Sequence, residues 1–199
     1  MWIVCADLEG VFVPEVWVNV AKKTGIEKLK LTTRDIKDYD ELMRYRLQLL
    51  DENNLKLQDI QRVIATLKPI DGALELVRWL RRKTRLIILS DTFIEFAQPL
   101  VDQLENPVLL CHSLETDETG RITNYKLRLP DAKRKTVEMF RSLNYRTLAF
   151  GDSYNDIAML KAADEGILFC PPDNVVAEYP EFPVTRSIPE LKSLLQKCL

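Results

Sequence analysis

Histidine is almost absent from this sequence, because His112 is the only one among the 199 residues. A zinc site built on a pair of histidines is therefore excluded, and no serine triad is evident around a single imidazole. None of the acidic motifs contains His112, so we predict that it is structural. Acid and base chemistry would then fall to carboxyl groups.

Cysteine is also scarce, and its distribution carries no pattern. The four cysteines have no metal-ligand spacing, and apolar residues surround three of them; they are Cys5, Cys111, Cys170 and Cys198. Packed free thiols are the natural interpretation, which is typical of a reduced, cytoplasmic protein.

Long apolar runs and an excess of one charge are missing as well. The first apolar run stops at Asp7, too soon for a signal peptide or a membrane span, and no later run approaches spanning length. The 28 basic and 30 acidic side chains give a net charge of -2. We therefore expect a small substrate rather than nucleic acid or a membrane as partner, and the oligomeric state stays open.

Three short apolar runs each end in acidic or hydroxyl side chains. The runs span residues 1–6, 86–89 and 148–150, and the polar residues after them are Asp7, Glu9, Ser90, Asp91 and Asp152. Such runs are typical of buried strands in a parallel sheet, where ligands bind beyond the carboxyl ends. One aspartate after a strand is usually a helix cap, but three such ends together predict a shared pocket.

Carboxylates gathered at one edge repel each other, so a cation or raised pKa values must accompany them. A set of oxygen ligands suits Mg²⁺, which keeps several waters and pairs with substrate phosphates. Zinc would require cysteine or histidine ligands, which this region lacks. The sequence therefore predicts a magnesium site and phosphate chemistry.

Arg46 stands in the apolar stripe of a helix predicted over 40–52, among leucine and methionine side chains. A buried charge there needs a partner. Two interpretations stay open. One is an internal salt bridge with Glu41 or Asp38, and the other is a guanidinium that holds a substrate carboxylate.

Lys133 is the second basic residue that helix geometry selects. It shares a face with Val137 and Phe140 in a helix that Asp131 would cap, while Lys135 faces outward. A solvated basic turn is one interpretation of Lys133. Phosphate binding is the other, and we favour it.

The order of the elements predicts an α/β fold with a Rossmann-like parallel sheet. Residues 15–68 are rich in helix formers, with helices expected near 15–24, 40–52 and 57–67, and would form a helical cap. Strands and helices alternate from Ile70 onward, so residues 1–14 and 69–199 would form the core. A β-hairpin is expected within 109–129, and a capping box at Ser187 and Glu190 would open the last helix.

The acidic motifs, in their order, carry a family resemblance. The segments that begin at Asp7 and Ser90, a lysine downstream and the segment 151–156 resemble the four motifs of the haloacid dehalogenase superfamily. The wording at 8–11, 32–36, 38–40, 64–69 and 88–93 resembles its bifunctional phosphoserine phosphatase and homoserine phosphotransferase group. Glu9 departs from the wider superfamily, where aspartate is usual, but agrees with that group.

The resemblance implies a phosphoserine phosphatase of serine and threonine biosynthesis, with homoserine as a second phosphoryl acceptor. Asp7 would form an aspartyl phosphate, and Glu9 would donate and accept the proton. Mg²⁺ would be held by Asp7, the Glu9 main chain and Asp152, with Asp156 supporting the metal shell. Asn155 would contact the substrate.

The resemblance also implies a substrate-binding set. Ser90, the Asp91 amide and Lys133 would hold the phosphoryl oxygens. Glu15 would meet the substrate ammonium group, and Arg46 its carboxylate. From the residues alone, Glu15 is equally an acid placed favourably at a helix N-terminus.

Two other functions stay open. A phosphatase of another small phosphorylated metabolite would use the same phosphate chemistry. A phospho-accepting signalling module also combines clustered acids, a hydroxyl and a lysine beside magnesium. That module places its aspartate on a central strand without a helical insertion, whereas here Asp7 follows the first strand and a cap follows it.

Overall fold

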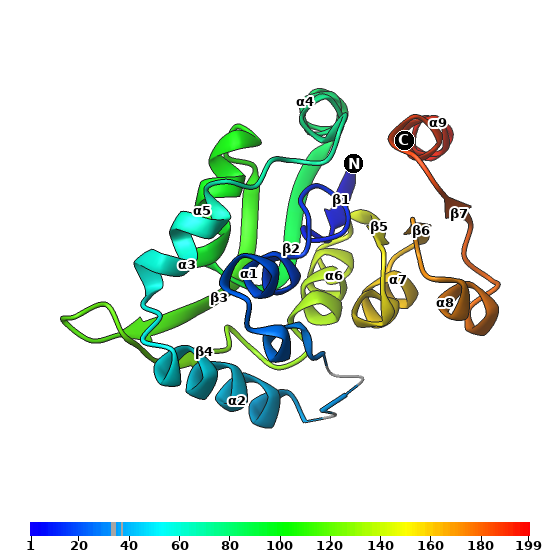
Figure 1. The fold of residues 1–199 in the computed structure, drawn as a ribbon. Coiled ribbons are helices and arrows are strands. Elements are labelled where there is room, and N and C mark those ends of the chain that lie inside the picture. The colour runs from blue at the N-terminus through cyan, green and yellow to red at the C-terminus, as the bar shows by residue number, and fades with distance from the viewer. Residues whose placement is uncertain (33–34, 37) are drawn as a thin grey trace.

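A seven-stranded sheet forms the centre of the computed structural model, in which residues 1–32, 35–36 and 38–199 are described. Its strand order is β4-β3-β2-β1-β5-β6-β7 (Figure 1), and the pair β3–β4 is antiparallel while the other neighbouring pairs are parallel. The strands are β1 (Trp2–Ala6), β2 (Arg85–Phe93), β3 (Val108–Thr116), β4 (Ile122–Lys126), β5 (Arg146–Gly151), β6 (Glu165–Phe169) and β7 (Val184–Thr185). The predicted Rossmann-like α/β fold is confirmed.

Helices cover both faces of the sheet, which explains why the central strand β1 is apolar throughout. Val4 and Ala6 face a core shared with the first group of helices, and Ile3 and Cys5 face the second. The first group is α4 (Ala73–Lys83), α5 (Ile94–Gln103) and α9 (Ile188–Cys198); the second is α6 (Ala132–Ser142), α7 (Ile157–Ala162) and α8 (Asp173–Glu178). Alternate residues of β1 thus serve both layers.

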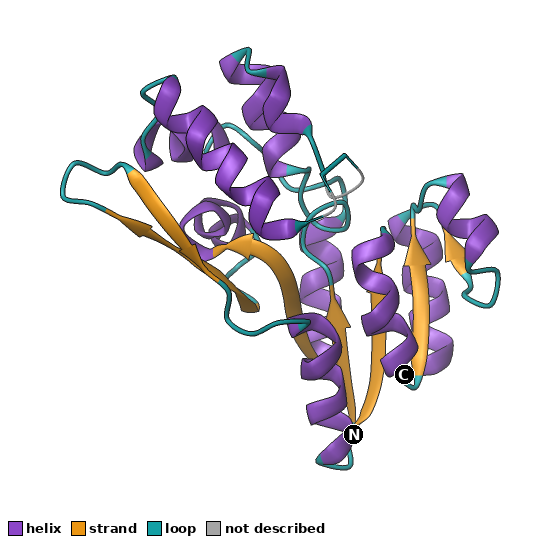
Figure 2. Cartoon of the chain, turned by 90° about the horizontal axis from the view of Figure 1, so that it is seen from below, coloured by secondary structure: helices purple, strands orange, loops and turns teal. Residues whose placement is uncertain are grey.

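A helical segment lies between β1 and α4, as expected. It consists of α1 (Val16–Thr24), the 3₁₀ turn η1 (Glu27–Lys30), α2 (Tyr39–Glu52) and α3 (Leu57–Ile64). Figure 2 shows helices gathered at the end of the sheet toward which β1 runs. Helix α3 ends three residues before the predicted limit of 67, because the chain tightens into 3₁₀-type turns ahead of Pro69. Residues 33, 34 and 37 lie outside the described chain. Two of them belong to segment 32–36, which is one of the segments that carry the family resemblance.

The predicted hairpin is confirmed, and it adds β4 to the edge of the main sheet. Asp117 and Gly120 form its turn. Strand β4 ends at Lys126, three residues before the predicted limit of 129. The hairpin also contacts the helical segment, which the sequence did not predict.

These contacts join the two segments at several points. Arg121 forms an ion pair with Asp51 of α2, at 2.5 and 2.8 Å. Tyr125 donates its hydroxyl proton to Asp40, and the Leu57 amide donates to the Gly120 carbonyl at 2.9 Å. The hairpin therefore braces α2 and the start of α3 from the side of the sheet.

Three smaller expectations are also tested. The Ser187 side chain accepts a hydrogen bond from the Glu190 amide at the start of α9, so the last helix is confirmed. The cysteines are free thiols. Within the described ranges, no helix combines the length and apolar character needed to cross a membrane.

Candidate active site

The carboxyl ends of β1, β2 and β5 lie side by side, because β1 sits between the other two strands. Ala6 is in register with Ile88 on one side and with Phe150 on the other. Asp7 continues the ladder, since its amide donates to the Phe150 carbonyl at 3.0 Å. The three apolar runs therefore meet at one edge, as predicted, but β2 continues to Phe93, so Ser90 and Asp91 lie within this strand rather than after it.

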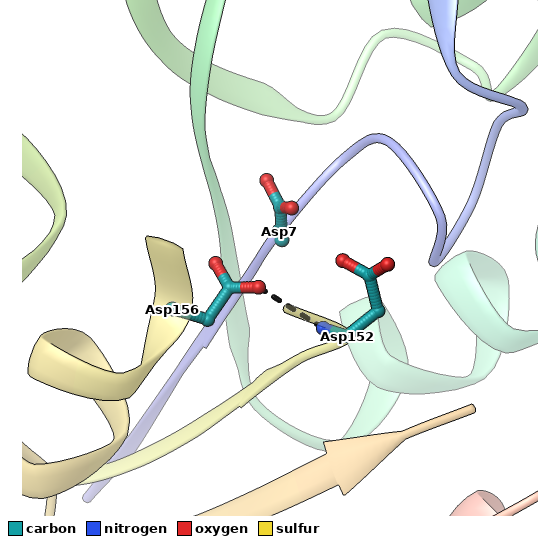
Figure 3. A group of neighbouring side chains, drawn as sticks. All are labelled: Asp7, Asp152 and Asp156. Carbon is teal, nitrogen blue, oxygen red and sulfur yellow. Dashed lines mark hydrogen bonds between the residues drawn. The ribbon is translucent and has the colours of Figure 1, made fainter. Parts of the chain in front are cut away.

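Three carboxyl groups converge at this edge. Asp7, Asp152 and Asp156 each place a carboxylate oxygen within 4.8 Å of the others (Figure 3). Asp156 accepts hydrogen bonds from the amides of Asp152 and Ser153, at 3.0 and 3.2 Å. Asp152 makes no such bond through its carboxylate to another described residue, so its oxygens are available to a ligand.

Two glycines make room for these carboxylates. A Cβ atom on Gly10 would lie 2.5 Å from Asp152 Oδ2, and one on Gly151 would overlap the Asp156 carboxyl group. Gly10 also has φ +73°, in the left-handed region that other residues rarely adopt. The acids thus pack directly against the backbone.

Lys133 is buried at the centre of the cluster. Its Nζ atom lies 2.8 Å from Asp7 Oδ1, 2.8 Å from Asp156 Oδ1 and 3.8 Å from Asp91 Oδ2. Burial lowers the pKa of Lys133, but the charges of these aspartates outweigh it, and the pKa stands well above its ordinary value. A solvated basic turn is therefore the wrong interpretation.

The predicted cap of the helix that carries Lys133 is wrong. Asp131 does occupy the N-cap position of α6, but its backbone is left-handed, with φ 54°, and its side chain caps no amide. The carboxylate of Asp131 instead pairs with Arg134, one turn along the helix.

Without a cation, burial and mutual repulsion disfavour the ionised forms of the carboxyl groups in the cluster. Burial, followed by the charge of Asp156, raises the pKa of Asp7 well above its ordinary range. The same two causes raise the pKa of Asp152 to about 7. A donor set made of carboxylate oxygens with raised pKa values fits a hard cation such as Mg²⁺.

Glu9 and Glu15 form a second acidic pair beside the cluster. Glu9 Oε2 accepts a hydrogen bond from the Val16 amide at 2.8 Å, so Glu9 rather than Glu15 caps helix α1. Burial raises the pKa of Glu9, and burial together with the Glu9 charge raises that of Glu15 to about 7. The two carboxyl groups lie close enough for their charges to interact. Repulsion between two close carboxylates favours a proton on one of them.

Arg46 is buried without an ion pair in the described part of the chain. Its Nη2 atom donates to the Leu31 carbonyl at 2.7 Å, its guanidinium lies 4.6 Å from the Trp17 ring centre, and its Nε atom has no partner. The salt bridge considered from the sequence is absent, since Asp38 caps α2 and Glu41 is exposed. Burial lowers the pKa of Arg46 to about 10, but Tyr39, Glu9 and Glu15 act to raise it.

Comparison with known proteins places these residues in a family. A model of haloacid dehalogenase-like hydrolases matches residues 6–164. A phosphoserine phosphatase of Pseudomonas syringae pv. tomato is 60% identical over 96% of this chain and 80% of its own length. The chain belongs to the haloacid dehalogenase-like hydrolase family.

One further relative and one solved structure are also similar to this haloacid dehalogenase-like hydrolase. The phosphoserine phosphatase ThrH of Pseudomonas aeruginosa is 58% identical over 96% of this chain and 94% of its own length. A solved structure of a phospho-aspartyl intermediate analogue of phosphoserine phosphatase has a TM-score of 0.79 at 21% identity, covering 98% of this chain and 97% of the other. That structure supports the fold.

The remaining predicted residues of this hydrolase take different positions. Ser90 is buried and accepts a hydrogen bond from the Thr92 amide at 3.2 Å. The Asp91 carboxylate faces Lys133 and His112. Asn155 lies in the 3₁₀ turn η2 (Tyr154–Asp156), next to Asp156 in sequence, but its side chain is exposed and makes no hydrogen bond to a described residue.

The structure adds two residues that the sequence did not indicate. Tyr39 of α2 donates its hydroxyl proton to the Asp91 carbonyl at 3.4 Å. His112 Nε2 lies 3.6 Å from Asp91 Oδ1, so the histidine that we predicted to be structural stands beside the site. Its register opposite Phe93 is a tertiary feature that spacing along the chain does not reveal.

One argument against a signalling module is wrong. Although β1 is the first strand in sequence, it lies in the middle of the sheet, between β2 and β5. Asp7 therefore does follow a central strand. The helical segment after β1 is present, as expected, and this part of the argument stands.

Proposed function

We propose that this hydrolase is a magnesium-dependent phosphoserine phosphatase that acts through an aspartyl phosphate and also transfers the phosphoryl group to homoserine. The observation that carries the proposal is the buried contact of Asp7 with Lys133, inside an acidic cluster and beside the unpaired Arg46. The names of the relatives from the two Pseudomonas species support phosphoserine as the substrate.

Asp7 would act as the nucleophile through Oδ2, because its Oδ1 already accepts from Lys133 and from the Leu8 amide. Lys133 would hold one phosphoryl oxygen while it keeps Asp7 ionised and oriented. Ser90 and the Asp91 amide would bind the other oxygens as charge shifts during transfer.

Asp7, the Glu9 main chain and Asp152 would hold Mg²⁺, and Asp156 would support them. The bound ion would neutralise charge on the transferring phosphoryl group. Asp156 is suited to a supporting role, because its carboxylate is already held by two amides and Lys133.

Glu9 would donate a proton to the leaving oxygen and later accept one from the attacking hydroxyl group. A general acid must retain its proton near the working pH, and burial, which raises the pKa values of Glu9 and Glu15, supports this role. When a substrate ammonium group binds Glu15, that carboxyl would ionise, and its charge would favour the protonated form of Glu9.

Residues 15–68 would serve as a cap over a core of residues 1–14 and 69–199. Arg46 from the cap would receive the substrate carboxylate, Glu15 the ammonium group, and Asn155 would add a contact from the core side. The hydrogen bond from Tyr39 in the cap to the Asp91 carbonyl in the core supports a closed arrangement over the site.

Homoserine would serve as acceptor because it carries the same ammonium and carboxylate groups as serine on a chain one carbon longer. Glu15 and Arg46 would seat it once serine leaves, and Glu9 would activate its hydroxyl group. A well-oriented alcohol competes with abundant water, since effective molarities reach about 10⁵ M or more.

Phosphorus NMR tests the whole proposal in one titration. Phosphoserine, Mg²⁺ and increasing homoserine should give phosphohomoserine and proportionally less free phosphate. If free phosphate accounted for all consumed phosphoserine at saturating homoserine, the transferase activity would be excluded and a phosphatase would remain. Turnover of other phosphate esters but not of phosphoserine would indicate a different metabolite, and a single phosphorylation without turnover would indicate a signalling module.

A further inference from the structure

The hydrogen bonding of His112 within the sheet defines which ring nitrogen carries the proton. It lies on β3 and is buried, and its Nδ1 atom accepts a hydrogen bond from the Arg128 amide at 3.0 Å. A neutral imidazole that accepts at one nitrogen carries its proton on the other. Nε2 is therefore the donor, and it points toward Asp91.

A series of electrostatic contacts links this imidazole to the proposed nucleophile, Asp7. His112 Nε2 lies 3.6 Å from Asp91 Oδ1, Asp91 Oδ2 lies 3.8 Å from Lys133 Nζ, and Lys133 Nζ lies 2.8 Å from Asp7 Oδ1. The first two distances exceed those of tight hydrogen bonds, so the attraction is mainly electrostatic. The two oxygens of Asp91 thus face two different donors.

An ionised carboxylate beside a phosphate-binding lysine is a liability. Asp91 competes with phosphoryl oxygens for the Lys133 ammonium group and repels them. Its side chain is 39% exposed, so without a second partner it could swing toward Lys133. His112 offers that partner on the side away from Asp7.

We propose that His112 is a positioning residue, which holds the Asp91 carboxylate against β3 and thereby keeps Lys133 directed at Asp7 and the phosphoryl group. The inference rests on the proposed phosphatase function. It assigns His112 an effect on phosphate affinity and turnover that a purely structural residue would lack.

His112 also has a structural contact, which must be separated from this role. The Arg128 residue whose amide it binds donates through Nη2 to Thr136 Oγ1 of α6 at 2.9 Å. Loss of the Nδ1 acceptor would therefore disturb the segment that leads into the Lys133 helix.

Two variants separate the contacts. An asparagine places its carboxamide near the position of Nδ1, and a glutamine reaches the position of Nε2. His112→Asn therefore retains the acceptor for Arg128 and loses the donor to Asp91, whereas His112→Gln retains the donor. Each is made in the natural chain and in the Asp91→Asn background, which removes the charge but keeps the Asp91 amide.

In the natural background, His112→Asn should lower kcat/KM about tenfold and weaken the binding of inorganic phosphate, while His112→Gln should stay within about threefold. In the Asp91→Asn background, the loss caused by His112→Asn should shrink to about twofold or less, because contacting residues are coupled. Equal losses in both backgrounds, or a loss in both His112 variants that follows a fall in Tm, would overturn the proposal.

The single histidine permits a test without changing it. Nitrogen-15 NMR of the one imidazole should show the Nε2–H tautomer, and the Nε2 signal should move in Asp91→Asn and when inorganic phosphate binds. An Nε2 signal unaffected by both changes would overturn the proposal. A small phosphate ester serves as second substrate, so failure of phosphoserine turnover alone rejects the proposed substrate and not the role of His112.

Discussion

Arg46 is a residue whose burial is unfavourable for folding and suited to binding. Its Nε atom has no partner in the described chain, and no carboxylate forms an ion pair with it. Replacing buried charge by an apolar side chain of similar size is often neutral or stabilising. We therefore expect the free energy of unfolding of Arg46→Met to lie within about 1 kcal/mol of that of the natural chain, or above it.

The same variant should lose phosphoserine turnover by about 10- to 100-fold, the equivalent of a lost charge-assisted hydrogen bond. Turnover of a small phosphate ester without a carboxylate should change little. Urea denaturation and steady-state kinetics on both substrates measure these effects. Arg44→Met, on the exposed side of α2, is the control that should alter neither, and equal losses on both substrates would assign Arg46 to structure.

Gly151 is the residue at which backbone and acid are in closest contact. In Gly151→Ala the new Cβ would displace the Asp156 carboxyl group, which holds Lys133 and two amides. Overpacking of this kind costs about 1–3 kcal/mol. Activity should fall about 100-fold, because a shift of 1 Å in a catalytic group has effects of that order.

Denaturant unfolding and phosphate release test this prediction together. Gly25→Ala is a suitable control, because Gly25 has a positive φ of 74° but nothing lies within 4 Å of the position that its new Cβ atom would take. The control should lose some stability and keep its activity. If Gly151→Ala stayed active, the close packing of Asp156 would not be needed for catalysis.

At the scale of elements, the strand ends were predictable and the tertiary register was not. Asp7, Ser90 and Asp152 were recognised because each follows an apolar run, and parallel strands bring such ends to one edge. The position of His112 opposite Phe93 depends on how β3 aligns with β2. Local patterns carry no information on that alignment, so the neighbour of Asp91 was missed.

In the helices too, local features were predictable and tertiary contacts were not. The stripe of α2 predicted that Arg46 would be buried, and it is. The sequence could not decide its partner, because the alternatives differ in tertiary contacts rather than in helical phase. Likewise Glu15 stands at the start of α1, as one of its two interpretations required, but the amide of Val16 is capped by Glu9, six residues earlier.

The hairpin should influence how tightly the proposed cap covers the site. Arg121 and Asp51 form an exposed ion pair between them, so Arg121→Gln should change the free energy of unfolding by less than about 1 kcal/mol. A looser cap admits more water, and we expect the ratio of free phosphate to phosphohomoserine to rise at a fixed homoserine concentration.

Phosphorus NMR of the product mixture measures that ratio. Arg78→Gln removes a similarly exposed pair, with Glu105, away from the cap, and should leave the ratio unchanged. An identical ratio in both variants would show that the hairpin contact does not control access of water. A large loss of stability in Arg121→Gln alone would instead indicate that the hairpin supports folding.

Over the whole molecule, charge is balanced but unevenly placed. The net charge is only -2, yet one edge of the sheet gathers six carboxyl groups around Lys133; they are Asp7, Glu9, Glu15, Asp91, Asp152 and Asp156. Burying these carboxyl groups is unfavourable for folding, and favourable interactions elsewhere in the molecule must offset this cost. Stability should therefore depend on pH and on a cation.

The sign follows from Asp152, whose pKa rises from an ordinary 3.8 to about 7 on folding without metal. Between these values the folded state holds a proton that the unfolded state has lost, so this contribution to stability is present below pH 4 and disappears as the pH rises to 7. Mg²⁺ at the proposed site would bind the deprotonated carboxylates. Its stabilising effect should therefore be larger at pH 8 than at pH 5.5.

Thermal unfolding with Mg²⁺ or with a chelator, at both pH values, tests this prediction. At a concentration 100 times its Kd, Mg²⁺ should add about 2.7 kcal/mol at pH 8, a rise in Tm of about 5–10 °C. Asp152→Asn removes a ligand and the charge together. Without metal it should be more stable than the natural chain at pH 8, and Mg²⁺ should raise its Tm far less. Equal Mg²⁺ effects in both proteins, or at both pH values, would place the cation elsewhere, because a site that includes Asp152 must bind in competition with its proton.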